Sequence, residues 1–209
     1  ASELHSVKVN VPGDISSAAY FIAVGLMVPG SEILIKNVGI NPTRDGLLRV
    51  CQDMGADITL LNENYGNGEP TADLLVRHSE LHGVTVGGSV IPTLIDELPV
   101  VAALACFARG TTVIRDAQEL KVKESNRIDV MVNNLRAMGA HIEGTDDGMI
   151  IEGGYPLHGA IIDSHLDHRI AMTFAITALA SDGETSIKGA DCVKISYPGF
   201  YEDLTRLAK

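Results

Sequence analysis

The chain has 209 residues, of which 45% are hydrophobic, and a net charge of −11 from 16 basic and 27 acidic residues. This length and apolar content suffice for one sizeable hydrophobic core. The acidic balance argues against general nucleic-acid or anionic-membrane binding, because both partners require gathered positive charge. We therefore expect no nucleic-acid and no membrane partner.

Cysteine usage and apolar runs narrow the class further. The 3 cysteines include no CxxC pair, so we expect neither a disulfide framework nor a zinc site, and the cytoplasm is the simplest location. The longest apolar run, 98–108, is too short to span a bilayer. The N-terminus shows no signal-peptide pattern and lacks Met, which fits either Met removal or a piece of a longer protein.

The first part of the chain predicts a helix, a strand, a second helix and a pair of strands. An apolar helix follows Gly13-Asp14, and a turn at Pro29-Gly30 leads into the first strand. The expected elements are a helix over 18–28, a strand over 32–35, a helix over 45–54, and strands over 57–61 and 73–77.

The same order of elements returns twice. The second copy predicts a helix over 98–108, a strand over 111–114, a helix over 125–138, and strands over 141–143 and 149–152. The third copy predicts a helix over 170–179, a strand over 185–187 and a helix over 198–207. In the first two copies the second helix ends in Met-Gly-Ala, and Gly is expected just after a helix C-terminus.

The first helix of each copy is apolar almost all round, which is typical of buried helices. No low-complexity linker divides the chain. We therefore predict an α/β fold in which residues 1–209 form a single domain. Its three repeats, related by pseudo-threefold symmetry, bury their first helices and place their sheets outside.

A dense group of charges lies at Lys121–Arg127, which contains three cations and one carboxylate. Ser125 and Asn126 are good helix N-caps, and apolar residues at helical spacing follow them. The charges therefore lie where a loop enters a helix, a place that favours an anion. This pattern indicates a proton donor or acceptor beside a bound anion; the alternative is a solvated charge run before a surface helix.

Asp96 directly precedes the apolar helix of the second copy, and Pro99 lies in the first turn. Asp14 and Asp167 occupy equivalent places in the other copies. The simplest structural role for all three is therefore that of an N-cap, a position where Asp is strongly preferred.

Asp163–Arg169 carries polar side chains into the buried helix of the third copy. Arg169 opposes the helix dipole there, so it requires an anionic partner. His168 is either a structural histidine or part of a site, and metal binding with His165 has little support from this spacing. Lys194 precedes the last helix, so helix N-termini could bring Arg127, Arg169 and Lys194 together around a multiply charged anion.

Five motifs occur in one order along the chain. They are Gly-Asp-Ile-Ser-Ser-Ala at 13–18, Ile-Pro-Thr-Leu-Ile-Asp-Glu at 91–97, Lys-Val-Lys-Glu-Ser-Asn-Arg at 121–127, Leu-Asp-His-Arg-Ile-Ala-Met at 166–172 and Lys-Ile-Ser-Tyr-Pro at 194–198. Together they resemble the 5-enolpyruvylshikimate-3-phosphate synthase family over essentially the whole chain. The resemblance implies two similar domains, each of three βαβαββ-like units, and this chain corresponds to the C-terminal domain.

The resemblance also implies an activity in the shikimate pathway. The family transfers the enolpyruvyl group of phosphoenolpyruvate to the 5-hydroxyl of shikimate 3-phosphate, and it needs no metal or organic cofactor. Its N-terminal domain, which supplies further substrate contacts, would be the partner of this chain. The isolated chain is therefore expected to lack turnover.

The motif matches suggest a role for each polar residue. Asp96 resembles the carboxylate that accepts the 5-hydroxyl proton, and Glu124 resembles the one that protonates the methylene carbon of phosphoenolpyruvate. Lys123 resembles a contact to the shikimate phosphate. The cations that resemble the phosphoenolpyruvate ligands are Arg127, Arg169 and Lys194.

Three further positions stand in or beside these motifs with weaker assignments. His168 would neighbour the substrates without an assigned role. Glu119 stands where some members carry an Asn that contacts the shikimate phosphate, and Asn126 stands where many members carry Asp.

Other functions compete with this one. The same chemistry on a UDP-linked amino sugar shares the fold, although the Lys-x-Lys-Glu-x-x-Arg and Asp-His-Arg motifs argue against it. A different class of function is a non-catalytic anion-binding domain, which only the cations at the helix N-termini support.

Overall fold

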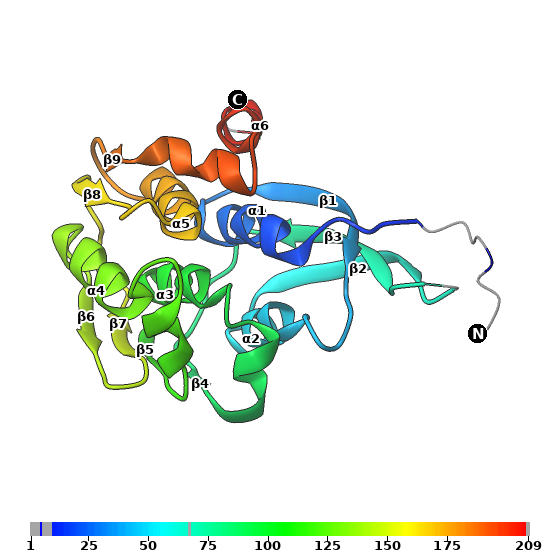
Figure 1. Ribbon diagram of the computed structural model, residues 1–209, viewed down its shortest axis with the longest axis horizontal. Coiled ribbons are helices and arrows are strands. Elements are labelled where there is room, and N and C mark those ends of the chain that lie inside the picture. The colour runs from blue at the N-terminus through cyan, green and yellow to red at the C-terminus, as the bar shows by residue number, and fades with distance from the viewer. Residues whose placement is uncertain (1–4, 6–9, 67, 208–209) are drawn as a thin grey trace.

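The computed structural model describes residues 5, 10–66 and 68–207, and its elements follow one another in three similar units (Figure 1). In Figure 1 the helices α1, α3 and α5 lie in the middle of the molecule, and the strands lie around them. No helix in the described part of the chain has the length and apolarity needed to cross a lipid bilayer.

The first unit forms a three-stranded antiparallel sheet in the order β1-β3-β2. A parallel bridge between Gly13 and Val38 adds a short extended segment before the first helix. The elements of this unit are α1 (Ile15–Met27), β1 (Glu32–Gly39), α2 (Gly46–Asp53), β2 (Asp57–Asn64) and β3 (Thr71–Arg77).

The second unit forms a four-stranded sheet in the order β4-β5-β7-β6, in which only β4 and β5 are parallel. Its elements are β4 (Thr85–Val86), the 3₁₀ helix η1 (Gly88–Thr93), α3 (Leu98–Phe107), β5 (Gly110–Ile114), the 3₁₀ helix η2 (Gln118–Val122), α4 (Arg127–Ala137), β6 (His141–Gly144) and β7 (Met149–Gly153).

In the third unit, β8 and β9 pair in parallel. Its elements are β8 (Ile161–Asp163), α5 (His168–Leu179), β9 (Ser186–Lys188), the 3₁₀ helix η3 (Ala190–Ile195) and α6 (Phe200–Leu207). The predicted α/β order of three repeats is thus confirmed, with short strands before α3 and α5 that the sequence pattern did not indicate.

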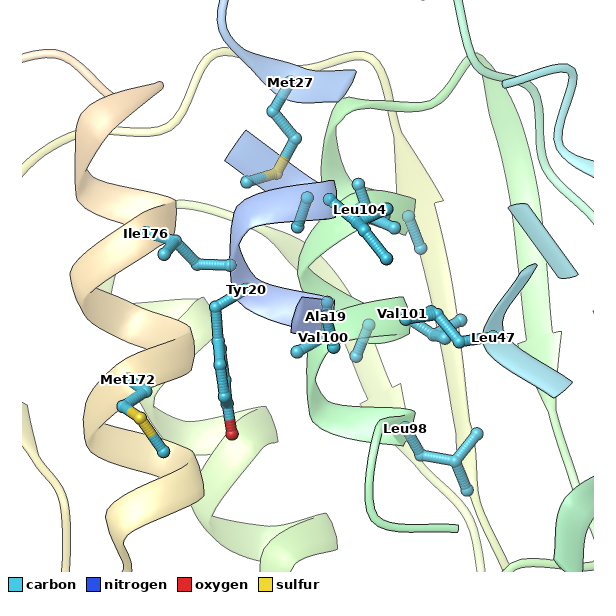
Figure 2. Close-up of a cluster of buried hydrophobic side chains, with 14 of the residues drawn as sticks. Ala19, Tyr20, Met27, Leu47, Leu98, Val100, Val101, Leu104, Met172 and Ile176 are labelled. Carbon is cyan, nitrogen blue, oxygen red and sulfur yellow. The ribbon is translucent and has the colours of Figure 1, made fainter. Parts of the chain in front are cut away.

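The three buried helices pack against one another pairwise. In Figure 2, the Tyr20 side chain of α1 runs alongside α5, which carries Met172 and Ile176, and Val100 and Leu104 belong to α3. All five side chains are 3% exposed or less. Burying one such side chain stabilises the fold by roughly 1.5–3 kcal/mol. The prediction of buried helices inside and sheets outside is therefore confirmed.

Small residues allow α1 to approach its sheet closely. A Cβ atom built on Gly25 would lie 2.9 Å from Cγ1 of Val76 in β3, which is shorter than a van der Waals contact. Gly25 therefore lets the helix backbone lie directly on the strand, and a larger residue there would force the two apart.

The helix starts show which of the three equivalent aspartates are caps. Asp14 accepts hydrogen bonds from the backbone of α1, and Asp167 accepts them from the backbone of α5. In α3 the N-cap is Glu97, which makes no side-chain cap bond. The cap interpretation of Asp96 was therefore wrong. An N-cap side chain bonds the second or third backbone N–H of a helix, and Pro99 at the second position has none.

The β1-β3-β2 sheet carries two β-bulges, one on each of the strands that flank β3. The pairing of β3 shifts between Ile35 and Val38 on β1, and between Leu61 and Asn64 on β2. Asp73 of β3 joins both bulges: its Oδ1 accepts from the backbone N–H of Asn37 (2.7 Å), and its Oδ2 accepts from Nδ2 of Asn62 (2.8 Å). Both asparagines have left-handed backbones, with φ of 53° and 50°. One carboxylate thus fixes both irregular turns.

Candidate active site

The N-terminal ends of α3, α4 and α5 bring most of the predicted site residues together. Asn126 caps α4 by accepting a hydrogen bond from the backbone of Asp129 (3.3 Å). Because Asp167 caps α5 in the same way, Arg127 and Arg169 both lie in the first turn of a helix. Asp96 lies just before α3 and faces both arginines.

Arg127 lies at the centre of this group. Its side chain is fully buried and donates to three carboxylates: from Nε to Asp167 (2.8 Å), from Nη1 to Asp96 (3.2 Å) and from Nη2 to Glu124 (2.5 Å). A buried guanidinium is tolerated only when it is paired and hydrogen-bonded. Arg127 is thus the cation around which the predicted acid and base are arranged.

Asp167 is the buried partner of Arg127. Its carboxylate also accepts from the Ser125 hydroxyl (3.0 Å) and from the backbone N–H of Arg169 (3.0 Å). Burial alone would raise the pKa of Asp167, but the hydrogen bonds and charge of Arg127, with the Ser125 contact, outweigh it and lower that pKa. Asp167 therefore holds a negative charge beneath the site.

Asp96 is a more accessible carboxylate, with 32% of its side chain exposed. Its oxygens lie 3.5 Å from Nζ of Lys123, 3.2 Å from Nη1 of Arg127 and 3.6 Å from Nη2 of Arg169. Burial would raise the pKa of Asp96, but the charges of Arg169, Lys123 and Arg127 outweigh it and lower that pKa. Asp96 is thus an ionised carboxylate that solvent and a bound molecule can reach.

Arg169 has the anionic partners that its place at a helix start requires. Besides Asp96, it lies 3.5 Å from Oε1 of Glu97, which is 1% exposed. Glu97 accepts a hydrogen bond from the Ser16 hydroxyl, which in turn accepts one from Nη2 of Arg44 (2.8 Å). Sequence reasoning assigned no role to these three residues. Ser16 and Glu97 stand inside recognised motifs, whereas nothing around Arg44 marked it.

Three predicted residues lie at the edge of the group. Glu119 pairs with Lys123 (2.5 Å) and is 61% exposed. His168, the first residue of α5, is buried; burial and then the charge of Arg169 lower its pKa, which favours the neutral ring. Glu124, half-exposed, reaches the group through Arg127.

Lys194 stands apart from the other cations in its contacts. It lies in η3, is 67% exposed, and its Nζ pairs with Asp191 at 2.7 Å. In the described residues its one ion pair involves no other candidate side chain. The structure thus joins Arg127 and Arg169 through Asp96, while a convergence of Lys194 with them stays a prediction.

Possible metal ligands do not gather in this region. Within the described ranges, no group of three or more His, Cys, Asp or Glu side chains is arranged to hold a metal ion. The carboxylates around Arg127 are already paired with cations.

Comparison with solved structures places the fold in a class. The enolpyruvyl transferase NikO from Streptomyces tendae superposes with a TM-score of 0.75 over 96% of this chain and 44% of its own, at 20% identity, which shows the fold alone. EPSP synthase from Acinetobacter baumannii superposes with a TM-score of 0.91 over 94% of this chain and 46% of its own, at 42% identity. The chain therefore has an enolpyruvyl transferase fold.

Sequence comparison then gives the family. Residues 1–204 match the family described as EPSP synthase (3-phosphoshikimate 1-carboxyvinyltransferase), so the chain belongs to that family. The 3-phosphoshikimate 1-carboxyvinyltransferase of Thermoanaerobacter sp. (strain X514) is 55% identical over 205 residues, which are 98% of this chain and 48% of that protein. The resemblance seen in the motifs is confirmed, and the chain spans about half the length of such relatives.

Proposed function

We propose that this chain supplies the C-terminal half of an active site that transfers the enolpyruvyl group of phosphoenolpyruvate to the 5-hydroxyl of shikimate 3-phosphate, releasing phosphate. Membership of the EPSP synthase family supports the reaction class. The observation that carries the proposal for this chain is the position of Asp96, an accessible, ionised carboxylate held by three cations where three helices begin.

In this proposal Asp96 is the general base. Its lowered pKa keeps it ionised near neutral pH, and its partial exposure lets a hydroxyl group approach. Asp96 takes the proton of the 5-hydroxyl while that oxygen attacks C2 of phosphoenolpyruvate. Glu124 gives a proton to the methylene carbon, which becomes a methyl group, and a tetrahedral ketal results. Glu124 then takes a proton back from the methyl group, the phosphate leaves with the proton that Asp96 holds, and the enolpyruvyl ether of the acceptor forms.

The cations of the group bind the substrate anions. Arg127, Arg169 and Lys194 hold the carboxylate and phosphate of phosphoenolpyruvate, and Lys123 contacts the shikimate phosphate. In the described conformation each of these cations is paired with a protein carboxylate. A substrate anion can therefore take the place of a solvent-exposed carboxylate, such as Glu124, which pairs with Nη2 of Arg127. Because one anion replaces another beside the same cation, the net electrostatic energy changes little.

Glu119 and His168 have subordinate parts in this site. Because Glu119 is anionic, it would repel a phosphate, and its pairing with Lys123 makes it a competitor for that cation. His168 lies beside Arg169 with a neutral ring, so it adds hydrogen-bonding capacity without charge.

A second domain completes the proposed site. The chain spans 48% of its Thermoanaerobacter relative, so about half of such a protein lies outside it. We expect residues 1–209 to fold as one domain, and we expect the missing N-terminal half to provide the remaining substrate contacts. A cytoplasmic location is part of the same proposal.

Phosphate release tests the proposal. We expect no turnover from the chain alone with phosphoenolpyruvate and shikimate 3-phosphate, and turnover when an N-terminal half is added. A UDP-linked amino sugar in place of shikimate 3-phosphate should give none. Turnover by the lone chain would contradict the half-site, and activity only with the UDP-sugar would contradict the acceptor.

A further inference from the structure

Glu97 is a buried acidic residue that the proposed reaction does not use. It stands at the N-cap of α3 and is 1% exposed, yet its side chain bonds no backbone N–H of that helix. A carboxylate withdrawn from water without compensation is costly, so its contacts must explain why it is retained.

Glu97 belongs to the second unit, and its contacts come from the first and the third. The Ser16 hydroxyl of α1 donates to Oε1, and the same hydroxyl accepts from Nη2 of Arg44, which lies before α2. Nη1 of Arg169, in α5, lies 3.5 Å from that oxygen, and Nη2 of Arg44 lies 4.0 Å from it. One carboxylate oxygen thus lies between two guanidinium groups and a hydroxyl.

Arg169 is held by two carboxylates that differ in accessibility. Its Nη2 lies 3.6 Å from Asp96, which is 32% exposed, and its Nη1 lies 3.5 Å from the buried Glu97. A substrate that engages Asp96 changes the first contact. It cannot reach the second, because Glu97 lies beneath the surface. Glu97 is therefore the partner that can hold the guanidinium in one orientation throughout a reaction.

We propose that Glu97 is a positioning residue, which holds the Arg169 guanidinium, with Arg44 beside it, in the orientation that receives an anionic substrate. The inference rests on the proposed function, because it takes Arg169 as a substrate ligand. Glu97 acts through Arg169 and does not touch the substrate. Its role is to restrict rotation of the planar Arg169 guanidinium, because the hydrogen bonds of that group to a substrate anion depend on its orientation.

The pKa of Glu97 shows how a positioning role can be distinguished from a role in stabilising the fold. Burial raises the pKa of Glu97, although the hydrogen bond from Ser16 and the charges of Arg169 and Arg44 oppose the shift. The other groups that face it are Asp96, from its own segment, and Tyr20 of α1. The pKa of Glu97 is higher in the folded chain than in the unfolded chain. Ionisation of Glu97 therefore lowers the free energy of unfolding as the pH rises above the pKa of the unfolded chain. A neutral substitute should therefore not weaken the fold at neutral pH.

The test uses E97Q, R169A and the double variant of this chain, each assembled with an N-terminal half, with E152Q as a control at an exposed glutamate. Melting temperature, the affinity for phosphoenolpyruvate by calorimetric titration, and the ¹⁵N NMR signals of the Arg169 guanidinium are measured. We expect E97Q to keep the melting temperature at pH 7.5 and to weaken binding about tenfold. We also expect it to merge the two Nη signals of Arg169, as free rotation does.

The double variant shows whether Glu97 acts through Arg169. If it does, E97Q adds no further loss of affinity in the R169A background. Unchanged Arg169 signals in E97Q, or losses that add in the double variant, would overturn the inference and leave the proposed function standing. Phosphoenolpyruvate binding that R169A does not weaken would overturn the proposed function, and this inference with it.

Discussion

Removal of the Arg127 side chain should test the buried ion pair directly. R127A leaves three carboxylates without their shared cation. Asp96 and Glu124 are 32% and 50% exposed, so water solvates them and their loss of a partner has a small energetic effect. Asp167 is 0% exposed and stays buried as an unpaired charge, a situation that costs about 3–5 kcal/mol.

The lower end of that range is the better expectation. Asp167 keeps the Ser125 hydroxyl and the backbone N–H of Arg169, both at 3.0 Å, after Arg127 is removed. We therefore predict a loss of about 3 kcal/mol in the free energy of unfolding. For a chain of this size the melting temperature should fall by about 6–12 °C. Urea denaturation at pH 7.5 measures the first quantity and a thermal scan the second.

Two comparison variants make the test specific. Arg109 is 79% exposed and pairs with Glu80 at the surface, so R109A should change stability by less than about 0.5 kcal/mol. Adding D167N to R127A should recover part of the loss, because Asn removes the unpaired charge and still caps α5. A loss below 1 kcal/mol in R127A, or no recovery in the double variant, would refute the reasoning.

Three further predictions concern the acid, the sheet and pH. In the chain assembled with an N-terminal half, E124Q should lower kcat at least about a hundredfold with little change in KM. A kcat within a few-fold of that of the unchanged chain would mean that Glu124 has only a structural role. D73A should lower the urea midpoint modestly and D73N by less. In D73N the amide oxygen can still accept from the backbone of Asn37, and the amide NH2 can donate to Asn62 once the Asn62 amide turns over. Equal midpoints for D73A and the unchanged chain would contradict this. Because the folded-state pKa of Asp167 is lowered, its stabilising contribution is present above pH 3.8 and is lost as pH falls through the lower folded value. The melting temperature of D167N should therefore vary less between pH 5 and pH 2.5 than that of the unchanged chain.

Local patterns were enough to predict the framework of the fold. Helices that are apolar all round have to be buried, and three of them in repeated context predict a core made by those helices. The strands β4 and β8 were missed because two or three extended residues are too few for any alternation to show. The bulges at Asp73 were missed because they depend on pairing with distant strands.

The candidate site was predicted in part, and for a different reason. The motifs identified Asp96, Glu124, Arg127 and Arg169, which the structure joins in one network. Sequence could not show which cations Asp96 faces, because Arg127 lies 31 residues and Arg169 73 residues along the chain from it. Arg44 is the clearest case: it has no local signal, and its contacts with Ser16 and Glu97 exist only in the folded chain.

The pairwise packing of α1, α3 and α5 has a consequence for cooperativity. In a linear repeat protein each unit touches only its neighbours along the chain, so end units can fray one at a time. Here the first and third units touch as directly as the first and second do. Opening any one unit exposes apolar surface on both of the others, so the most protected amides of all three helices should exchange with solvent through one common unfolding event.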